Sequence, residues 1–380
     1  MTTKRQKRRK NLFLVAFFYI LSLVGILSYH FLHSSVPRTD SWTAQIHNHA
    51  MLPTQQKKAP VPLCLYQGSV MPPSPTFIIG GAQKTGTSSL HMYLSAHPLI
   101  VGTLKDESHF FTLTVPWLER RLPENQTSGQ AKHCFIRERY ISELKNPTAV
   151  VSNHTLFSFE KTPSYLYAPE VPQRLREICP WIPKMIFLLR HPVDRAFSQH
   201  GMEQKRARTF NHTDRIMPFD DKITQDLKLM ETMNMIRRVS TPSSHEGFPN
   251  YEPIPRSEWR PDFPEHVNKN LLIRGIYSYQ LKHWFNHYPR ESILVLDYYK
   301  LMLNTTSVYH EILDFVGIPY PPEMPDFSAK KRQSSIHNDA GLSNETRAYL
   351  EAFFAPWNAQ LESILGEEWK GVWTEEARDF

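Results

Sequence analysis

Cysteine is scarce in this sequence, whose 380 residues include only Cys64, Cys134 and Cys179. Three cysteines are too few for a scaffold held together by disulfides, and their spacing fits no zinc-binding motif. At most one pair can be bridged, which leaves one thiol over. The sequence does not choose the pair.

Acidic residues are absent from the first ten positions, which hold six basic ones: Lys4, Arg5, Lys7, Arg8, Arg9 and Lys10. These six account for most of the net charge of +7 and leave +1 for the other 370 residues. The body of the protein is thus close to neutral, so any site for a polyanion must be a local patch. We expect no nucleic-acid partner.

Charge of either sign is missing from Leu12 to Tyr29, a run of eighteen mostly apolar residues. The run is at the short end of what spans a bilayer, and the basic residues before it predict a cytoplasmic N-terminus. A cleaved signal peptide is the alternative, but the run is long for one and no small-x-small cleavage site follows it. We expect a basic cytoplasmic tail at 1–11, an uncleaved transmembrane signal anchor at 12–32 and a single-pass type II topology.

Glycosylation motifs agree with that topology. Five N-x-[ST] acceptors begin at Asn125, Asn153, Asn211, Asn304 and Asn344. A single match arises by chance, but five in one chain favour a body on the lumenal side of the membrane. Between anchor and body, residues 33–75 are proline-rich without apolar periodicity, which is typical of a stem. The folded domain is expected from about Thr76 to the end, over 76–380.

Predicted strands and helices alternate beyond Thr76. Apolar runs at 77–79, 184–189 and 293–296 predict short buried strands. Helices are predicted around Leu90, Tyr93 and Leu94, along a stripe of Ile273, Tyr277, Leu281 and Trp284, and at about 307–316 and 344–363. Buried strands separated by helices indicate an α/β fold with a central, mainly parallel sheet flanked by helices.

The first strand runs into a glycine-rich segment, Gly80-Gly81-Ala82-Gln83-Lys84-Thr85-Gly86-Thr87-Ser88, and then into the first helix. Backbone N–H groups at such a turn and the positive end of the helix form an anion site, to which the hydroxyls of Thr85, Thr87 and Ser88 add donors. The nucleotide-triphosphatase pattern G-x-x-x-x-G-K-[ST] is matched by Gly81 and Gly86, but Thr87 stands where it requires lysine. An ATP-dependent kinase is therefore disfavoured. An ordinary glycine turn before a helix is the plainer alternative.

From Phe77 to Pro98 the sequence resembles the 5′-phosphosulfate loop of sulfotransferases that use 3′-phosphoadenosine 5′-phosphosulfate (PAPS) as donor. The form Gln-Lys-Thr-Gly-Thr is most similar to heparan sulfate N-sulfotransferases. The resemblance implies a P-loop-like single domain in which Lys84 contacts the phosphosulfate bridge. It also implies that the donor is bound by the residues after this lysine, Thr85, Gly86, Thr87 and Ser88.

Two further motifs resemble heparan sulfate sulfotransferases. The segment Glu107-Ser108-His109-Phe110-Phe111 is similar to a Glu-x-His-Phe-Phe motif of the 3-O-sulfotransferases, which implies that Glu107 is the catalytic base and His109 supports it. Alone, it would be no more than a solvated turn. A carboxylate suits this step, because an acceptor hydroxyl is a poor nucleophile until its proton is removed. The segment Glu160–Tyr165 resembles a Glu-Lys-Thr/Ser-Pro/Ala-x-Tyr motif, which implies that Lys161 is a second cation near the transferred group rather than a surface residue.

The strand at 184–189 leads into a segment from Arg190 to Ser198 that resembles the family's 3′-phosphate site. Arg190 can bind phosphate with two hydrogen bonds and Ser198 can donate another, whereas an arginine that caps a strand is the alternative. The resemblance continues from Arg274 to Pro319. It departs at 330–332, Lys-Lys-Arg, where heparan sulfate enzymes carry a cysteine-bridged hairpin and a Lys-Gly-Arg loop, so cofactor contacts there stay open.

Residues 202–266 are polar, match the family weakly and carry a set of basic residues: Lys205, Arg206, Arg208, Arg237 and Arg238. This segment either grips an anionic glycan or is a solvated loop. Farther on, Trp284 and Phe285 are expected in the core. His283 and His287 are expected to be structural, because no third metal ligand accompanies them.

Together these motifs predict transfer of a sulfuryl group from PAPS to a hydroxyl or amine of a polysaccharide, by in-line displacement that needs no metal. The expected acceptor is a heparan-sulfate-like glycosaminoglycan; chondroitin- or dermatan-type galactosamine, or another polysaccharide, is the alternative. A catalytically inactive lumenal glycan-binding protein is the alternative from a different class. We expect a Golgi membrane glycoprotein with a lumenal catalytic domain, and the oligomeric state is open.

Overall fold

A computed structural model of the chain describes residues 64–66, 69–70, 74–122, 129–144, 150–151, 154–240, 248–259, 270–328 and 342–374. The expected tail and anchor at 1–32, most of the expected stem and the basic triplet at 330–332 lie outside these ranges. Within the described ranges, no helix combines the length and the apolar character needed to cross a membrane.

Five strands form the central sheet: β3 (Phe77–Gly81), β4 (Ile100–Val101), β7 (Phe157–Lys161), β8 (Lys184–Leu189) and β11 (Ile293–Asp297). They lie in the order β11-β8-β3-β7-β4, and every neighbouring pair is parallel. The predicted α/β fold and its three predicted strands are confirmed. Because the strands are parallel, the loops that follow β3, β7 and β8 meet at one edge of the sheet, where ligands bind in open α/β folds.

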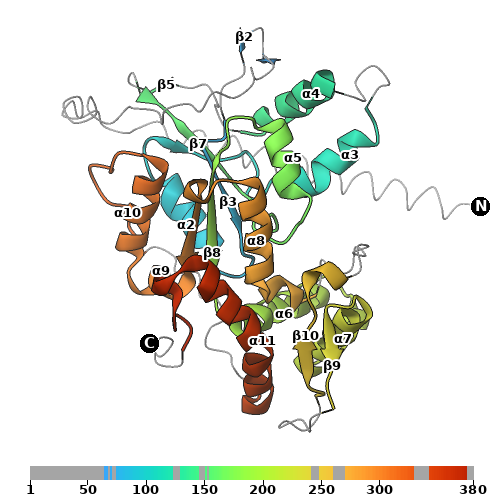
Figure 1. Cartoon of the computed structure of the whole chain (residues 1–380). Helices are drawn as coiled ribbons and strands as arrows, with labels where there is room; N and C mark the ends of the chain where they lie inside the picture. The colour runs from blue at the N-terminus through green and yellow to red at the C-terminus, as the bar shows by residue number, and fades with distance from the viewer. Residues whose placement is uncertain are drawn as a thin grey trace, which may run out of the picture. The chain divides into compact units, whose positions relative to one another are not determined.

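Helices cover both faces of the sheet (Figure 1). On one face, Met185, Phe187 and Leu189 of β8 share a core cluster with residues of α5 (Val171–Ile178) and α8 (Tyr277–His287). On the other face, Ile186 and Leu188 pack with helices that lie together in Figure 1: α2 (Thr87–Ser95), α9 (Tyr298–Leu303) and α10 (Thr305–Val316). Successive side chains of a strand point to opposite faces, so a strand covered on both is apolar throughout.

The two late predicted helices are confirmed as α10 and α11 (Asn344–Leu365), but one predicted stripe is interrupted. Helix α8 begins at Tyr277, whereas Ile273 lies in a separate short 3₁₀ turn, Ile273–Gly275. Ile276 between them has a ψ of 69°, which is outside the helical region and breaks the continuity.

Within α8, the predicted core residues are confirmed: Trp284 is fully buried and Phe285 packs against the same cluster. The two histidines bond to backbone carbonyls, His283 to Pro169 at 2.7 Å and His287 to His283 at 3.0 Å. Among the described residues, no group of three or more His, Cys, Asp or Glu side chains is arranged to hold a metal ion.

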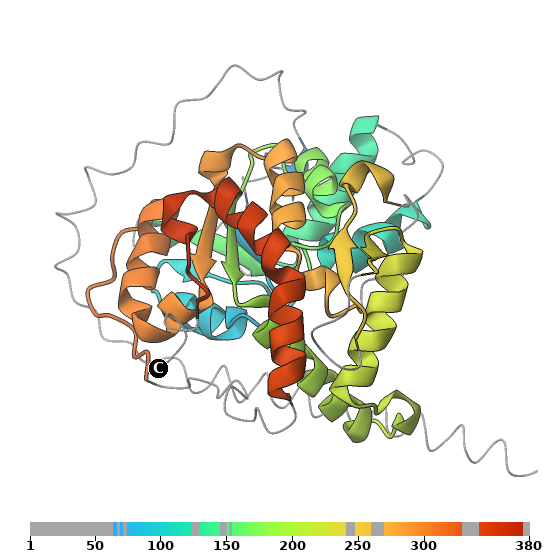
Figure 2. The same cartoon turned by 60° about the horizontal axis from the view of Figure 1, so that its bottom comes forward.

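The described part of the weakly matched segment is folded, so the solvated-loop alternative is wrong there. It contains the end of α6 (Pro192–Thr209), the whole of α7 (Phe219–Thr232), two 3₁₀ turns (Thr213–Arg215 and Arg256–Glu258) and a hairpin of β9 (Ile236–Arg238) and β10 (Tyr251–Pro253). Helix α7 buries Ile223, Leu227 and Met230 in a cluster that also contains Phe354 of α11. Figure 2 brings this group of helices forward, with the red helix α11 at its front.

Three of the five basic side chains of this segment lie beside a neighbouring residue. Arg237 pairs with Glu252 across the hairpin, at 2.5 Å, and the guanidinium of Arg238 lies 5.9 Å from the centre of the Tyr251 ring. Arg206 lies 6.0 Å from the ring of the exposed Phe210.

The structure decides the cysteine pairing that the sequence left open. Cys64 is bridged to Cys134 of α4 (Gly129–Ile141), and Cys179 is a buried free thiol. Cys64 is itself buried, so the folded structure extends to the N-terminal side of Thr76, where it was predicted to begin. The remaining elements are the short strands β1 (Leu65–Tyr66), β2 (Ser69–Val70), β5 (Val150–Val151) and β6 (His154–Thr155), the π-helical turn η2 (Phe110–Thr114), α3 (Val115–Glu119) and two 3₁₀ turns (Arg290–Ser292 and Glu367–Trp369).

Candidate active site

The loop between β3 and α2 has the backbone of an anion-binding turn. Gly86 precedes α2 with a φ of 85°, and a Cβ at this position would lie 3.2 Å from the ring of Tyr298. Lys84 also has a left-handed backbone, with a φ of 73°; this region is costly for any residue but glycine, and such residues cluster at functional sites. Thr85 donates a hydrogen bond from Oγ1 to the carbonyl of Ala82 at 2.7 Å, which closes the loop on itself.

Arg190 lies at the end of β8, beside this loop. Its Nη1 donates to the carbonyl oxygen of Lys84 at 3.5 Å, and its guanidinium lies 4.8 Å from the centre of the Tyr298 ring. Burial, reinforced by the charge of Arg190, lowers the pKa of Lys84 below its ordinary value. Arg190 is 4% exposed, and its Nε has no hydrogen-bond partner among the described residues. An anion bound between the two cations would satisfy this buried donor and relieve the repulsion.

The other predicted donor-binding residues lie on helices. Thr87 is buried and Ser88 is half-buried in the first turn of α2, and Ser198 is 8% exposed in α6. Within the described ranges, no hydrogen bond joins the Ser198 hydroxyl to Lys84 or Arg190. The structure therefore brings the lysine and the arginine together, and the role of Ser198 stays a prediction.

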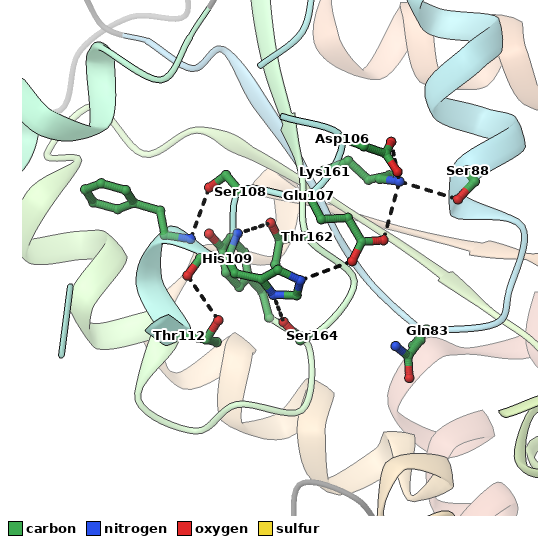
Figure 3. Close-up of polar contacts among 12 residues, drawn as sticks. Gln83, Ser88, Asp106, Glu107, Ser108, His109, Thr112, Lys161, Thr162 and Ser164 are labelled. Carbon is green, nitrogen blue, oxygen red and sulfur yellow. Dashed lines mark hydrogen bonds and ion pairs between the residues drawn. The ribbon is translucent and has the colours of Figure 1, made fainter. Parts of the chain in front are cut away.

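Glu107, His109 and Lys161 come together beside the loop, as Figure 3 shows. His109 Nε2 lies 3.2 Å from Glu107 Oε2, and Lys161 Nζ lies 3.4 Å from Glu107 Oε1. Burial alone would raise the pKa of Glu107, but the hydrogen bond to His109 and the charge of Lys161 outweigh it, so the pKa lies below its ordinary value. The carboxylate is therefore ionised at neutral pH, which is the state that a general base needs.

Lys161 connects this group to the anion-binding loop. Its side chain is 0% exposed, so the alternative of an ordinary surface residue is wrong. Besides Glu107, its Nζ contacts Asp106 Oδ1 at 2.9 Å and Ser88 Oγ at 3.4 Å. Because Ser88 belongs to α2, a single buried ammonium touches both the predicted base and the helix behind the loop. Asp106, which is 70% exposed, was not predicted as part of this group.

Glu160 is a second residue whose role sequence reasoning missed. It is fully buried, and its carboxylate accepts hydrogen bonds from the hydroxyls of Ser108, Tyr140, Thr162 and Tyr165. The available signal was a glutamate in a short segment with two phenylalanines, Phe157 and Phe159, followed closely by hydroxyl-bearing residues. A buried carboxylate needs such partners.

Arg274 is a third. Its Nη1 donates to Gln83 Oε1 at 2.5 Å and its Nη2 to the hydroxyl of Tyr167 at 2.7 Å. Burial lowers the pKa of Arg274 below its ordinary value. Because Gln83 directly precedes Lys84, this arginine ties a late segment of the chain to the anion-binding loop. A separation of 191 residues between Gln83 and Arg274 leaves no local pattern from which the contact could be predicted.

Comparison with known proteins gives consistent matches. Residues 74–336 match the family described as sulfotransferase domain. The bifunctional heparan sulfate N-deacetylase/N-sulfotransferase 4 of Mus musculus is 23% identical over 77% of this chain, and the membrane-associated sulfotransferase kil1 of Dictyostelium discoideum is 23% identical over 78% of it. The chain spans 30% of the length of the mouse protein and 66% of that of the Dictyostelium protein.

Among the solved structures that match, a bacterial sulfotransferase is similar in fold over most of both chains. A sulfotransferase from Alicyclobacillus acidocaldarius superposes with a TM-score of 0.50 at 23% sequence identity, covering 78% of this chain and 98% of that one. At this level of identity the likeness concerns the fold, and it agrees with the parallel sheet flanked by helices described above.

Proposed function

This chain belongs to the sulfotransferase domain family, and we propose on that basis that it transfers a sulfuryl group from PAPS to a hydroxyl or amine of a polysaccharide. The observation that carries the proposal is the position of Lys161. Its ammonium lies within 3.4 Å of both the Glu107 carboxylate and the Ser88 hydroxyl. A base and an anion-binding loop joined in this way suit a reaction in which one group loses a proton while another leaves as an anion.

Donor binding is assigned to the loop and to the end of β8. Backbone N–H groups from Lys84 to Ser88, the Lys84 ammonium and the Arg190 guanidinium would hold the phosphate and sulfate groups of PAPS. The unpartnered, buried Nε of Arg190 supports this fit. PAPS supplies the sulfuryl group, which the acceptor atom displaces in line from the phosphate.

Proton transfer is assigned to Glu107. Its ionised carboxylate removes the proton from the acceptor as the new bond to sulfur forms, while His109 holds one of its oxygens. Lys84 and Lys161 neutralise the negative charge that develops on the transferred group and on the leaving phosphate. The chemistry of these residues requires no metal ion.

The polysaccharide acceptor is supported by exposed side chains that follow His109 in the sequence. Leu113 and Trp117 are 65% and 49% exposed, and the guanidinium of Arg121 lies 4.4 Å from the centre of the Trp117 ring. These three side chains, the Trp117 ridge, follow His109 at four-residue spacing. Leu113 lies in η2, Trp117 lies in α3, and Arg121 comes just after α3. An exposed aromatic ring beside a cation suits a sugar that carries a carboxylate or sulfate, as in a heparan-sulfate-like glycosaminoglycan.

A lumenal position in the Golgi, behind a type II signal anchor, completes the proposal. The Cys64–Cys134 disulfide supports it, because disulfides persist in oxidising compartments. The glycosylation acceptors Asn211, Asn304 and Asn344 are exposed. Expression in the secretory pathway should therefore give a product whose mass falls on treatment with an N-glycosidase. An unglycosylated product would count against this topology.

The first experiment incubates the full-length protein with radiolabelled PAPS and a panel of desulfated polysaccharides: heparan, chondroitin and dermatan types. Label in one polymer would establish sulfuryl transfer and name the acceptor class. Binding of the nucleotide without transfer to any polymer would point to a different acceptor. If neither transfer nor binding of PAPS occurred while glycans bound, the protein would be a glycan-binding protein on a sulfotransferase fold.

A further inference from the structure

Glu160 lies behind the site, at the end of β7 and directly before Lys161. Its carboxylate is 0% exposed and accepts four hydroxyl hydrogen bonds. The donors are Ser108 at 2.9 Å, Thr162 at 2.8 Å, Tyr165 at 2.5 Å and Tyr140. Burial raises the pKa of Glu160 above its ordinary value, although all four donors favour the ionised form. A buried carboxylate with this many hydrogen-bond partners makes the surrounding structure rigid.

Three of these hydroxyls also accept hydrogen bonds from the backbone N–H groups of residues 109–111. Thr162 Oγ1 accepts a hydrogen bond from the N–H of His109 at 3.2 Å. Ser108 Oγ accepts one from Phe110 at 3.0 Å, and the Tyr165 hydroxyl accepts one from Phe111 at 3.3 Å. These are three consecutive N–H groups at the start of η2. The first N–H groups of a helix have no partner within it, and negative charge is favourable at that end.

The same three contacts hold His109 in an unusual conformation. Its φ is 52°, in the left-handed region that is costly for a residue other than glycine. A second hydrogen bond, 3.3 Å between His109 Nδ1 and Ser164 Oγ, fixes the ring (Figure 3). With backbone and ring both held, Nε2 is directed at Glu107.

We propose that Glu160 is a positioning residue whose carboxylate, acting through three hydroxyls, holds the Glu107–His109 pair in its productive orientation. This inference rests on the proposed role of Glu107 as the base. Lys161, whose ammonium contacts Glu107 at 3.4 Å, is the next residue in β7. Tyr140 contacts Glu160 without contacting the three N–H groups, so it lies outside this relay.

Tyr140 therefore provides a matched control. Tyr140→Phe and Tyr165→Phe each remove one hydroxyl from a fully buried ring that donates to Glu160. Only the second also removes the acceptor of the Phe111 N–H. Glu160→Gln, which keeps the shape of the side chain, tests the carboxylate itself.

Amide hydrogen exchange tests this relay, which runs from Glu160 through three hydroxyls to the N–H groups of residues 109–111, and it does not require an active enzyme. In Tyr165→Phe and Glu160→Gln, exchange in the peptide that contains residues 109–111 should accelerate by roughly tenfold, the effect of losing about one hydrogen bond. In Tyr140→Phe the same peptide should exchange as in the unaltered protein. Equal acceleration in both tyrosine variants, or in neither, would overturn the relay.

The pH profile of turnover tests the effect of the relay on the pKa of Glu107. The His109 contact is one cause of the low pKa of Glu107, so loosening His109 should raise that pKa. The acid limb of kcat/KM should then shift to higher pH in Tyr165→Phe and Glu160→Gln but not in Tyr140→Phe, with kcat reduced and the KM for PAPS unchanged. A fall in kcat with an unshifted limb in both would contradict positioning. If the unaltered protein transferred no sulfuryl group, the proposed function would fail, while the exchange result would still decide the relay.

Discussion

Two adjacent carboxylates contact the same buried ammonium, but only one of them has the surroundings of a base. Asp106 and Glu107 both lie within 3.4 Å of Lys161 Nζ. Asp106 is 70% exposed, whereas Glu107 is about one-third exposed and also contacts His109. The deeper burial of Glu107 and its closer histidine contact, 3.2 Å against 4.0 Å between His91 and Asp106, support the proposal that Glu107 is the base.

Glu107→Gln is expected to lower kcat by roughly 10²–10⁴-fold, the usual contribution of a general base. Affinity for the product nucleotide should change little, because the loop and Arg190 are untouched. Asp106→Asn is the control and should lower kcat by less than about fivefold, since its side chain is 70% exposed and an exposed carboxylate is well solvated. Steady-state kinetics and nucleotide titration measure both, and near-full activity in Glu107→Gln would remove this residue from the mechanism.

The pH dependence follows from the same carboxylate. The pKa of Glu107 lies below its ordinary value of 4.5, so the base is ionised throughout the neutral range and is protonated only as the pH falls below that value. The acid limb of kcat/KM is therefore expected below about pH 4.5. In His109→Gln a cause of the low pKa is lost, and the limb should move to higher pH. A limb that stays in place would show that His109 does not act on the base.

At the scale of the element, the turn before α2 depends on one glycine. Gly86→Ala must place a Cβ in a left-handed backbone and 3.2 Å from Tyr298. It should lower the free energy of unfolding by about 1–3 kcal/mol and weaken nucleotide binding. Gly201 in α6 is the control, because a Cβ there meets no atom within 4 Å and alanine favours a helix, so Gly201→Ala should raise that free energy by about 0.5–1 kcal/mol. Thermal or denaturant unfolding with and without nucleotide separates the two effects.

The Trp117 ridge makes a second prediction at this scale. Trp117→Ala should raise the KM for a polysaccharide acceptor by about five- to tenfold and leave the KM for PAPS unchanged, since the ring belongs to α3 and not to the donor loop. Phe210→Ala is the matched control: it removes an exposed aromatic ring with an arginine nearby from the end of α6. An effect confined to Phe210→Ala would move the acceptor site to the basic segment around α6 and α7.

At the scale of the whole molecule, one covalent bond joins the start of the described structure to its body. The Cys64–Cys134 bridge closes a loop with a sequence separation of 70 residues. Cys134→Ser should lower the free energy of unfolding by roughly 2–5 kcal/mol. Alkylation of the unfolded, unreduced protein should label only Cys179 among the three cysteines. Label on Cys64 or Cys134 would contradict the pairing.

The sequence by itself determined the α/β class, three strands of the sheet and the helices that follow them, because these depend on local apolar periodicity. It also indicated the short motifs that are proposed to carry the chemistry. Lys84 and Arg190 follow predicted strands and Glu107 follows the first predicted helix, whereas Lys161 was indicated by family resemblance alone, because the strand that ends with it, β7, was not predicted. Parallel strands deliver such positions to one edge of the sheet.

Only the tertiary structure decided which groups touch. The disulfide partner of Cys64, the four hydroxyls around Glu160 and the contact of Arg274 with Gln83 all join segments that are distant in the chain. The packing of the hydrophobic cluster around α7 also joins distant segments. From the sequence alone, this region could be either a solvated loop or a glycan-binding segment. Contacts of this kind depend on how the layers of the fold pack, and the pKa shifts depend on the burial that this packing produces. Neither leaves a periodic signal in the order of the residues.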